Sequence, residues 1–195
     1  AAMFLCGTPL ATDKGGEILL KSDYETAKQL LKEGGYDGTP IVVMQSTDVN
    51  VLNNLGPVAA EHLKKAGFNV DLQAMDWQTL VSRRAKKEKP AEGGWNIFMT
   101  SWSAIDILNP VMASGFSAKC DTAWFGWPCD DKMEDLRKAF ATETDAAKQK
   151  MIAEQIQVRA LEVGTHGHGG QWLGPSAWRK DKVEGVLDAP ILFHW

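Results

Sequence analysis

The chain lacks the features that mark a membrane protein, a nucleic-acid-binding protein or a common type of enzyme. No apolar run approaches the roughly 20 residues that a membrane-spanning helix needs. Lys and Arg number 21 against 25 Asp and Glu, giving a formal net charge of −4, so no basic face for phosphates is expected. A nucleophile-elbow motif, a phosphate loop and an H-E-x-x-H helix are all missing. We therefore expect neither catalytic residues, cofactor nor resident metal, and no nucleic-acid partner.

The first residues also lack a secretory signal, because they contain neither a basic stretch nor a long apolar run. The chain does not begin with Met, and an apolar segment starts directly at position 1. We interpret the sequence as a piece of a longer protein.

Hydrophobic periodicity predicts an α/β domain in the first half of the chain. Strands are expected at 40–45, 68–74 and 95–101, and helices at 23–33, 51–66 and 76–87. Helices that alternate with strands favour parallel pairing. The expected architecture is a small, mostly parallel sheet flanked by helices.

The second half has a different pattern. Residues 102–129 form a long loop rich in Trp, Gly and Pro, and such loops are usually functional or disordered. Two helices are expected at 131–141 and 145–163. Short extended pieces broken by glycine are expected to follow, at 166–173, 176–179 and 183–186.

Two sequence features leave alternatives open. His166 and His168 would face one side of a strand and reach one metal, which would suit a small metal-dependent enzyme, although no Cys or carboxylate stands nearby in sequence. Cys120 and Cys129 would form a disulfide in an oxidising compartment, or stay free thiols in a cytosolic interaction domain with buried Trp.

Several segments together resemble one family. They are Phe4–Leu10, Asp23–Tyr24 with Ala27–Glu33, Asn69–Trp77, Gly93–Phe98 and Ala123–Pro128. In this order they are similar to the C-terminal part of the family 5 extracellular solute-binding proteins of ABC transporters, the dipeptide, oligopeptide and nickel binders.

The resemblance implies that residues 1–195 form a single domain, the C-terminal lobe of a longer, two-lobed protein with the type II periplasmic-binding-protein fold. It implies capture of a small solute, such as a peptide or an amino-acid derivative, with this chain as one wall of the cleft. The implied partners are the remaining lobe and the membrane permease of the transporter, and the implied location is periplasmic or extracytoplasmic. It favours the Cys120–Cys129 disulfide with Cys6 free, and residues 189–195 resemble a strand that returns toward the other lobe.

The predicted ligand-binding residues lie on loops after the first and third strands, where ligands bind in open parallel sheets, and on the Trp-rich and Gly-Gln-Trp segments. They are Asp48, Ser101, Trp102, Ser103, Ala104, Asp106, Trp124, Trp127, Gln171 and Trp172. Asp106 would pair with an amine and Trp102 would contact an apolar group. For both Asp48 and Asp106 the alternative is that they only cap the turns that follow them.

Three departures from the family leave the solute open. Its usual acidic position falls at Ile105, one residue before Asp106, and loop 46–49 lacks the Arg of dipeptide binders. Residues 165–168 stand where the family has a tyrosine and prolines.

Tryptophan is over-represented, with eight residues against two tyrosines. A lobe without its partner leaves its ligand face uncovered, so we expect an exposed apolar surface that carries several of them.

Overall fold

In a computed structural model of the chain, residues 3–186 are described, apart from the side chain of Ile18. The predicted returning strand at 189–195 lies outside these residues. The chain divides into two compact units, one made of residues 21–101 and the other of residues 1–20 and 102–195, and each is treated separately below.

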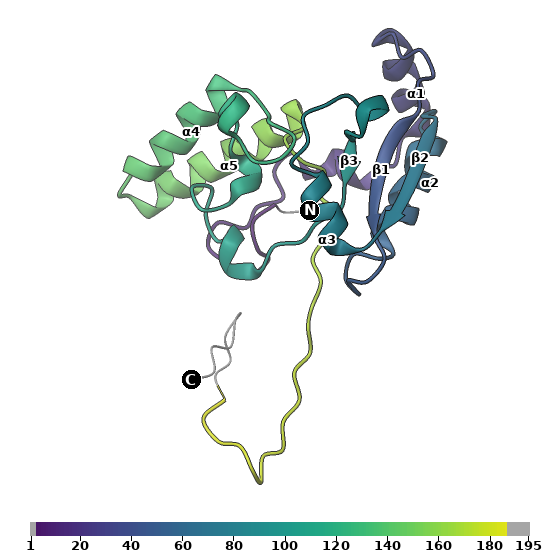
Figure 1. Cartoon of the computed structure of the whole chain (residues 1–195). Coiled ribbons are helices and arrows are strands. Elements are labelled where there is room, and N and C mark those ends of the chain that lie inside the picture. Colours follow the sequence, from purple (N-terminus) through teal and green to yellow (C-terminus); the bar gives the residue numbers. More distant parts are fainter. Residues whose placement is uncertain (1–2, 187–195) are drawn as a thin grey trace. The chain divides into compact units, whose positions relative to one another are not determined.

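The unit of residues 21–101 is a three-stranded parallel sheet with helices between its strands. The strands are β1 (Ile41–Ser46), β2 (Val70–Met75) and β3 (Ile97–Phe98), in the order β2-β1-β3 (Figure 1). Both pairings of β1 are parallel, as the alternation of elements predicts. The helices are α1 (Tyr24–Glu33), α2 (Leu55–Lys65) and α3 (Trp77–Arg83).

Capping residues set two of these helix starts where the sequence predicts them. Asp23 accepts a hydrogen bond from the backbone N of Thr26 at 3.0 Å, and Asp76 accepts one from Thr79 at 2.9 Å. The predicted start of α2 at residue 51 is wrong, because residues 51–54 form turns. Pro57 lies in the first turn of α2, where its missing N–H leaves no intrahelical hydrogen bond unmade.

Two other predicted boundaries are too long. The helix α3 ends at Arg83 rather than Lys87, and the indole Nε1 of Trp95 donates to the carbonyl of Arg84 at its C-terminus. The strand β3 covers only two of the seven predicted residues. Before it, the side chain of Asn96 accepts from Val42 N at 2.8 Å, so a side chain takes the place of one backbone partner of β1.

One buried cluster of this unit lies between the sheet and α3. Val42 and Met44 of β1 are buried with Leu80 of α3. Arg83 fixes the connection to β3, because its guanidinium donates to the carbonyl oxygens of Gly93 and Gly94 at 2.9 and 2.8 Å.

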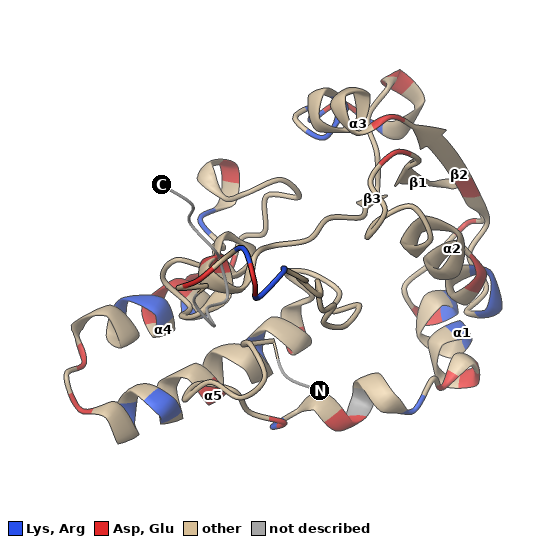
Figure 2. Ribbon diagram, turned by 90° about the horizontal axis from the view of Figure 1, so that it is seen from below, with Lys and Arg blue, Asp and Glu red and all other residues tan. Residues whose placement is uncertain are grey.

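The other unit is built on two packed helices, α4 (Asp131–Thr142) and α5 (Ala146–Val163) (Figure 1). Acidic and basic residues are interspersed along both helices (Figure 2). Their inner faces bury Met133, Phe140 and Ile156 against Phe4 and Phe116, which come from the N-terminal segment and the long loop. No helix among residues 3–186 is long and apolar enough to cross a membrane.

The long loop 102–129 is ordered by three short 3-10 helices, Ala104–Ile107, Ser114–Phe116 and Cys120–Thr122. The segment after Gly164 forms no strand among the described residues, so the three extended pieces predicted there are not strands. Up to residue 186 it is mostly irregular, with a turn at 180–182 in which Val183 N donates to the carbonyl of Arg179 at 3.0 Å.

Candidate functional site

Asp48 follows β1 and joins it to the start of α3. One of its carboxylate oxygens, Oδ1, accepts from the hydroxyl of buried Ser46 at 3.0 Å and from the backbone N of Trp77 at 2.8 Å. These contacts differ from the capping alternative, which concerned the turn that directly follows Asp48, because they join β1 to the start of α3. They also hold the carboxylate at the carboxyl end of the central strand, where ligands bind in open parallel sheets.

Asp106 forms a reciprocal capping pair with Ser103 at the start of the 3-10 helix Ala104–Ile107. Its Oδ2 accepts from the Ser103 hydroxyl at 2.6 Å and from the Ser103 backbone N at 3.3 Å. The residue is exposed to solvent. A capping role is therefore present for Asp106, and a second role would have to use the same fixed, exposed carboxylate.

An aromatic cluster surrounds the beginning of this loop. The indole of Trp102 lies 5.2 Å from that of Trp124 between ring centroids, and 5.9 Å from the imidazole of His166 in an edge-on arrangement. His166 in turn lies 5.4 Å from the ring of Phe116, which packs on Phe4. The structure thus brings the predicted residues Trp102 and Trp124 together, from positions 22 residues apart in the chain.

His166 is fixed by the loop on which it packs. Its Nδ1 lies 3.1 Å from the carbonyl oxygen of Gly115 and 3.1 Å from the hydroxyl of Thr165. Because a carbonyl can only accept, Nδ1 carries the proton and donates it. Burial lowers the pKa of His166, and the hydrogen bond to Gly115 opposes that shift.

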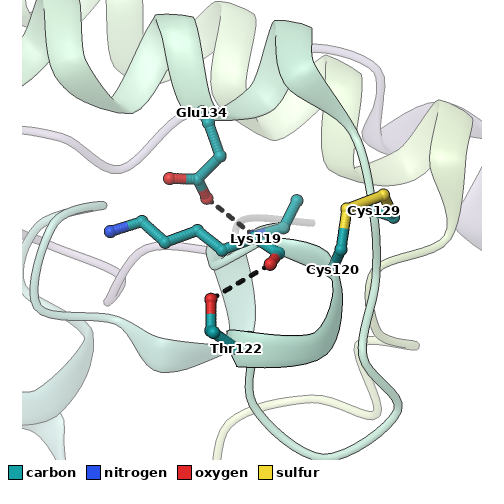
Figure 3. The surroundings of a disulfide bond; sticks show 6 residues. Lys119, Cys120, Thr122, Cys129 and Glu134 are labelled. Carbon is teal, nitrogen blue, oxygen red and sulfur yellow. Dashed lines mark hydrogen bonds between the residues drawn. A yellow bond between two sulfur atoms is a disulfide. The ribbon is translucent and has the colours of Figure 1, made fainter.

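The Cys120–Cys129 disulfide is present, with the Cα atoms 4.1 Å apart, and Cys6 is a free, exposed thiol (Figure 3). The bridge closes the loop that carries Trp124 and Trp127. Within it Cys120 and Trp127 have φ of 54° and 48°, a left-handed backbone that non-glycine residues rarely adopt. A closed loop that holds such a conformation presents its tryptophans in one arrangement.

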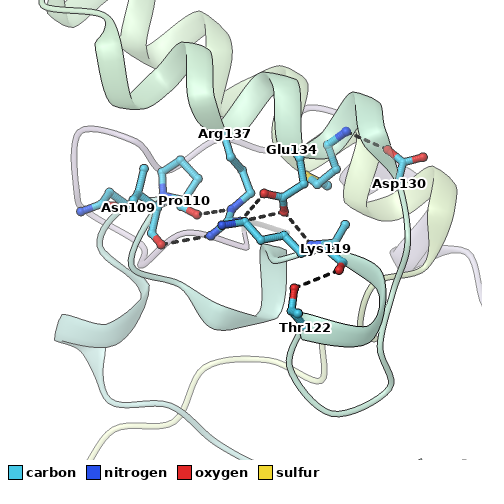
Figure 4. A network of polar contacts seen from close by, with 10 residues as sticks. Asn109, Pro110, Lys119, Thr122, Asp130, Glu134 and Arg137 are labelled. Carbon is cyan, nitrogen blue, oxygen red and sulfur yellow. Dashed lines mark hydrogen bonds and ion pairs between the residues drawn. The ribbon is translucent and has the colours of Figure 1, made fainter.

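A second set of contacts joins the long loop 102–129 to α4. The guanidinium of Arg137 pairs with Glu134 at 2.7 Å and donates to the carbonyls of Pro110 and Val111 at 3.0 and 3.1 Å, while Glu134 accepts from Ala118 N at 2.7 Å (Figure 4). Both side chains are largely shielded from solvent. One ion pair therefore positions two separate stretches of loop backbone.

The segment with Gln171 and Trp172 is exposed, and a hydrogen bond joins it to the N-terminal segment. The side chain of Gln171 accepts from Cys6 N at 3.2 Å. Trp172 is 52% exposed, and Trp178 is 47% exposed. Asp48 and Ser101 belong to the other compact unit, so this set of predicted residues is divided between the two.

None of the seven tryptophans among the described residues is buried, and they are divided between the two compact units. Five are partly exposed, at positions 77, 95, 102, 124 and 127, and two are exposed, at 172 and 178. Leu173, which follows Trp172 in the chain, is 84% exposed.

The described residues offer no set of metal ligands for the alternative of a small metal-dependent enzyme. Within residues 3–186, no group of three His, Cys, Asp or Glu side chains could hold a metal ion. Nδ1 of His166 instead faces the backbone carbonyl of Gly115, so this nitrogen is occupied by a hydrogen bond to the loop.

Sequence reasoning missed the part that His166 plays, because it considered the residue only together with His168. Its neighbours in space, Trp102 and Gly115, are more than 50 residues away in the chain. The available signal was a departure from the family pattern at 165–168, which marked the position but not its partners.

The family is shown by comparison with known proteins. Residues 7–124 match the model of the bacterial extracellular solute-binding proteins, family 5, middle region. The chain belongs to this family. It is also 35% identical, over 173 residues, to the "Probable peptide ABC transporter periplasmic-binding protein y4tO" of Sinorhizobium fredii, covering 89% of this chain and 32% of that protein.

Crystal structures of other proteins show the same fold. AppA from Clostridium difficile aligns with 84% of this chain and 33% of its own, with a TM-score of 0.67 and 17% identity. A dipeptide binding protein from Pseudoalteromonas sp. SM9913, in complex with Met-Leu, aligns with 84% and 32%, with a TM-score of 0.60 and 16% identity. The fold is that of the type II periplasmic binding proteins. The chain spans about a third of the length of these relatives.

Proposed function

We propose that the chain forms one lobe of a binding protein that captures a small solute for an ABC importer, and that it carries out no catalysis. The observation that carries this proposal is the Trp102–Trp124 pair at 5.2 Å, together with the fixed and exposed carboxylate of Asp106 four residues after Trp102 in the chain. Two partly exposed indole rings, those of Trp102 and Trp124, together with a carboxylate suit a solute with an apolar part and a cationic amine.

The solute we propose is a peptide or a peptide-like amino-acid derivative. The named relatives support this class, since one carries the word peptide in its name and another was crystallised with Met-Leu. The partners are then the remaining lobe of the complete protein and a membrane permease, and the location is periplasmic or extracytoplasmic.

The proposed contacts are the ten residues that the sequence predicts. They are Asp48, Ser101, Trp102, Ser103, Ala104, Asp106, Trp124, Trp127, Gln171 and Trp172. The backbone of residues 101–104 would bind an extended peptide as an added strand does.

The test begins with the complete protein purified without denaturation, whose retained solute is identified by mass spectrometry. Calorimetry with that solute then compares the parent with Trp102→Ala and Asp106→Asn. We expect Trp102→Ala to weaken binding at least about fivefold, because stacking on a Trp contributes on the order of 1 kcal/mol or more.

Asp106→Asn separates the two roles of this carboxylate. The amide oxygen of Asn can still accept from Ser103, so the cap persists while the charge is lost. Weaker binding with unchanged thermal stability supports contact with a cationic solute. Affinity equal to that of the parent in both variants would show that this site is wrong.

A further inference from the structure

Gly115 lies against both Trp102 and His166, and the space there is tight for even one additional carbon. A Cβ at position 115 would come within 3.2 Å of the Trp102 ring and 3.4 Å of two atoms of the His166 ring. Gly115 does not have a positive φ, so the restriction comes from these two rings and not from its backbone conformation. The three residues therefore form one packed unit.

The hydrogen bond to Gly115 sets the orientation of the imidazole within this unit. With Nδ1 donating to the Gly115 carbonyl at 3.1 Å, the plane of His166 is fixed edge-on to both Trp102 and Phe116, at interplanar angles of 74° and 73°. A neutral ring suits this apolar setting, in agreement with the pKa that burial lowers.

We propose that His166 is a positioning residue for the solute site, which holds the indole of Trp102 in its binding orientation through the Nδ1–H···O=C bond to Gly115. The inference rests on the proposed function only where it makes Trp102 a ligand contact. The positioning contact itself can be tested without any solute.

The decisive variant is His166→Phe, which keeps an aromatic ring of similar size and removes the donor. The complete protein is labelled with 5-fluorotryptophan, and the ¹⁹F signal of Trp102 is assigned by its loss in Trp102→Phe. We expect this signal to shift or broaden in His166→Phe, because the ring beside it is no longer fixed. His168→Phe, two residues away, serves as the matched control and should leave the signal in place.

A second variant covers the case in which His166→Phe does not fold. Gly115→Ala should shift the same ¹⁹F signal, because its Cβ would lie only 3.2 Å from the Trp102 ring, which has to give by a few tenths of an ångström. Gly167→Ala is its control, because a Cβ at Gly167 has no neighbour within 4 Å and the residue has no positive φ. A Trp102 signal identical to the parent in folded His166→Phe would overturn the proposal, since packing alone would then hold the indole.

The two proposals fail separately. If Trp102→Ala binds the retained solute like the parent while His166→Phe moves the Trp102 signal, then the ligand site is wrong and the positioning contact stands. If Trp102→Ala loses affinity while the signal stays unchanged in His166→Phe, then the solute site stands and the role of His166 is refuted.

Discussion

Asp130 and Arg159 form a bidentate ion pair that joins the start of α4 to the C-terminal part of α5. Nε of Arg159 lies 3.0 Å from Oδ1 of Asp130, and one terminal nitrogen lies 2.5 Å from Oδ2. Oδ1 also accepts from the backbone N of Met133 at 2.7 Å, so the same carboxylate caps α4. Because Asp130 directly follows Cys129, this pair sets the position at which the disulfide-closed loop returns to the helices.

Replacement of Asp130 should separate its two roles. Asp130→Asn keeps an oxygen to cap α4 and loses the ion pair, whereas Asp130→Ala loses both. We expect Asp130→Ala to be the less stable variant by about 1 kcal/mol, the usual worth of an N-cap. Urea unfolding followed by circular dichroism measures the difference. Equal stability of the two variants would show that the cap contributes nothing here.

The same carboxylate predicts how stability depends on pH. The hydrogen bond from Arg159 holds the pKa of Asp130 below its ordinary value of 3.8 in the folded state. The unfolded state then binds a proton more readily, so the contribution of Asp130 is complete above pH about 4 and is lost as the pH falls through the lower, folded pKa. Urea midpoints for the parent and Asp130→Asn should therefore converge below pH 4, and a constant gap down to pH 2 would contradict this assignment.

The disulfide should be measurable in the protein as purified. Thiol titration under non-reducing, denaturing conditions is expected to find one free thiol in this chain, that of Cys6. Replacement of both Cys120 and Cys129 by Ser should lower stability by about 2–3 kcal/mol in the chain-entropy model for so short a loop. The control is Cys6→Ser, which alters an exposed, free thiol. Three titratable thiols would refute the pairing.

Gln157 is a buried polar side chain that attaches the N-terminal segment to α5. It is 1% exposed, accepts from Met3 N at 2.8 Å and donates to the carbonyls of Thr12 and Lys14 at 3.0 and 2.8 Å. Gln157→Leu leaves these backbone groups without a partner, so we expect a loss of about 2 kcal/mol or more. Gln155→Leu on an exposed face of the same helix should change stability little. A similar loss in both variants would point to the helix and not to the buried hydrogen bonds.

The local elements of this chain follow from its sequence. Asp23, Asp76 and Asp145 each stand where a cap is needed, and all three accept the expected backbone hydrogen bond. The alternation of strands and helices predicted the parallel sheet. The limits of α3 and β3 did not follow from periodicity, because contacts from distant residues, such as Trp95 with Arg84 and Asn96 with Val42, decide where each element stops.

The candidate site, like the fold, was predictable from the sequence only in part. Composition and motif order indicated the family, and the positions of the loops indicated which residues to consider, because the carboxyl ends of parallel strands share one edge. Neither could place His166 beside Trp102 and Gly115, since that contact joins segments more than 50 residues apart and depends on the missing Cβ of one glycine. The sequence by itself determined the elements and their order. The arrangement of Trp102 and His166 was decided by side-chain packing between residues far apart in the chain, because no local sequence pattern encodes such contacts.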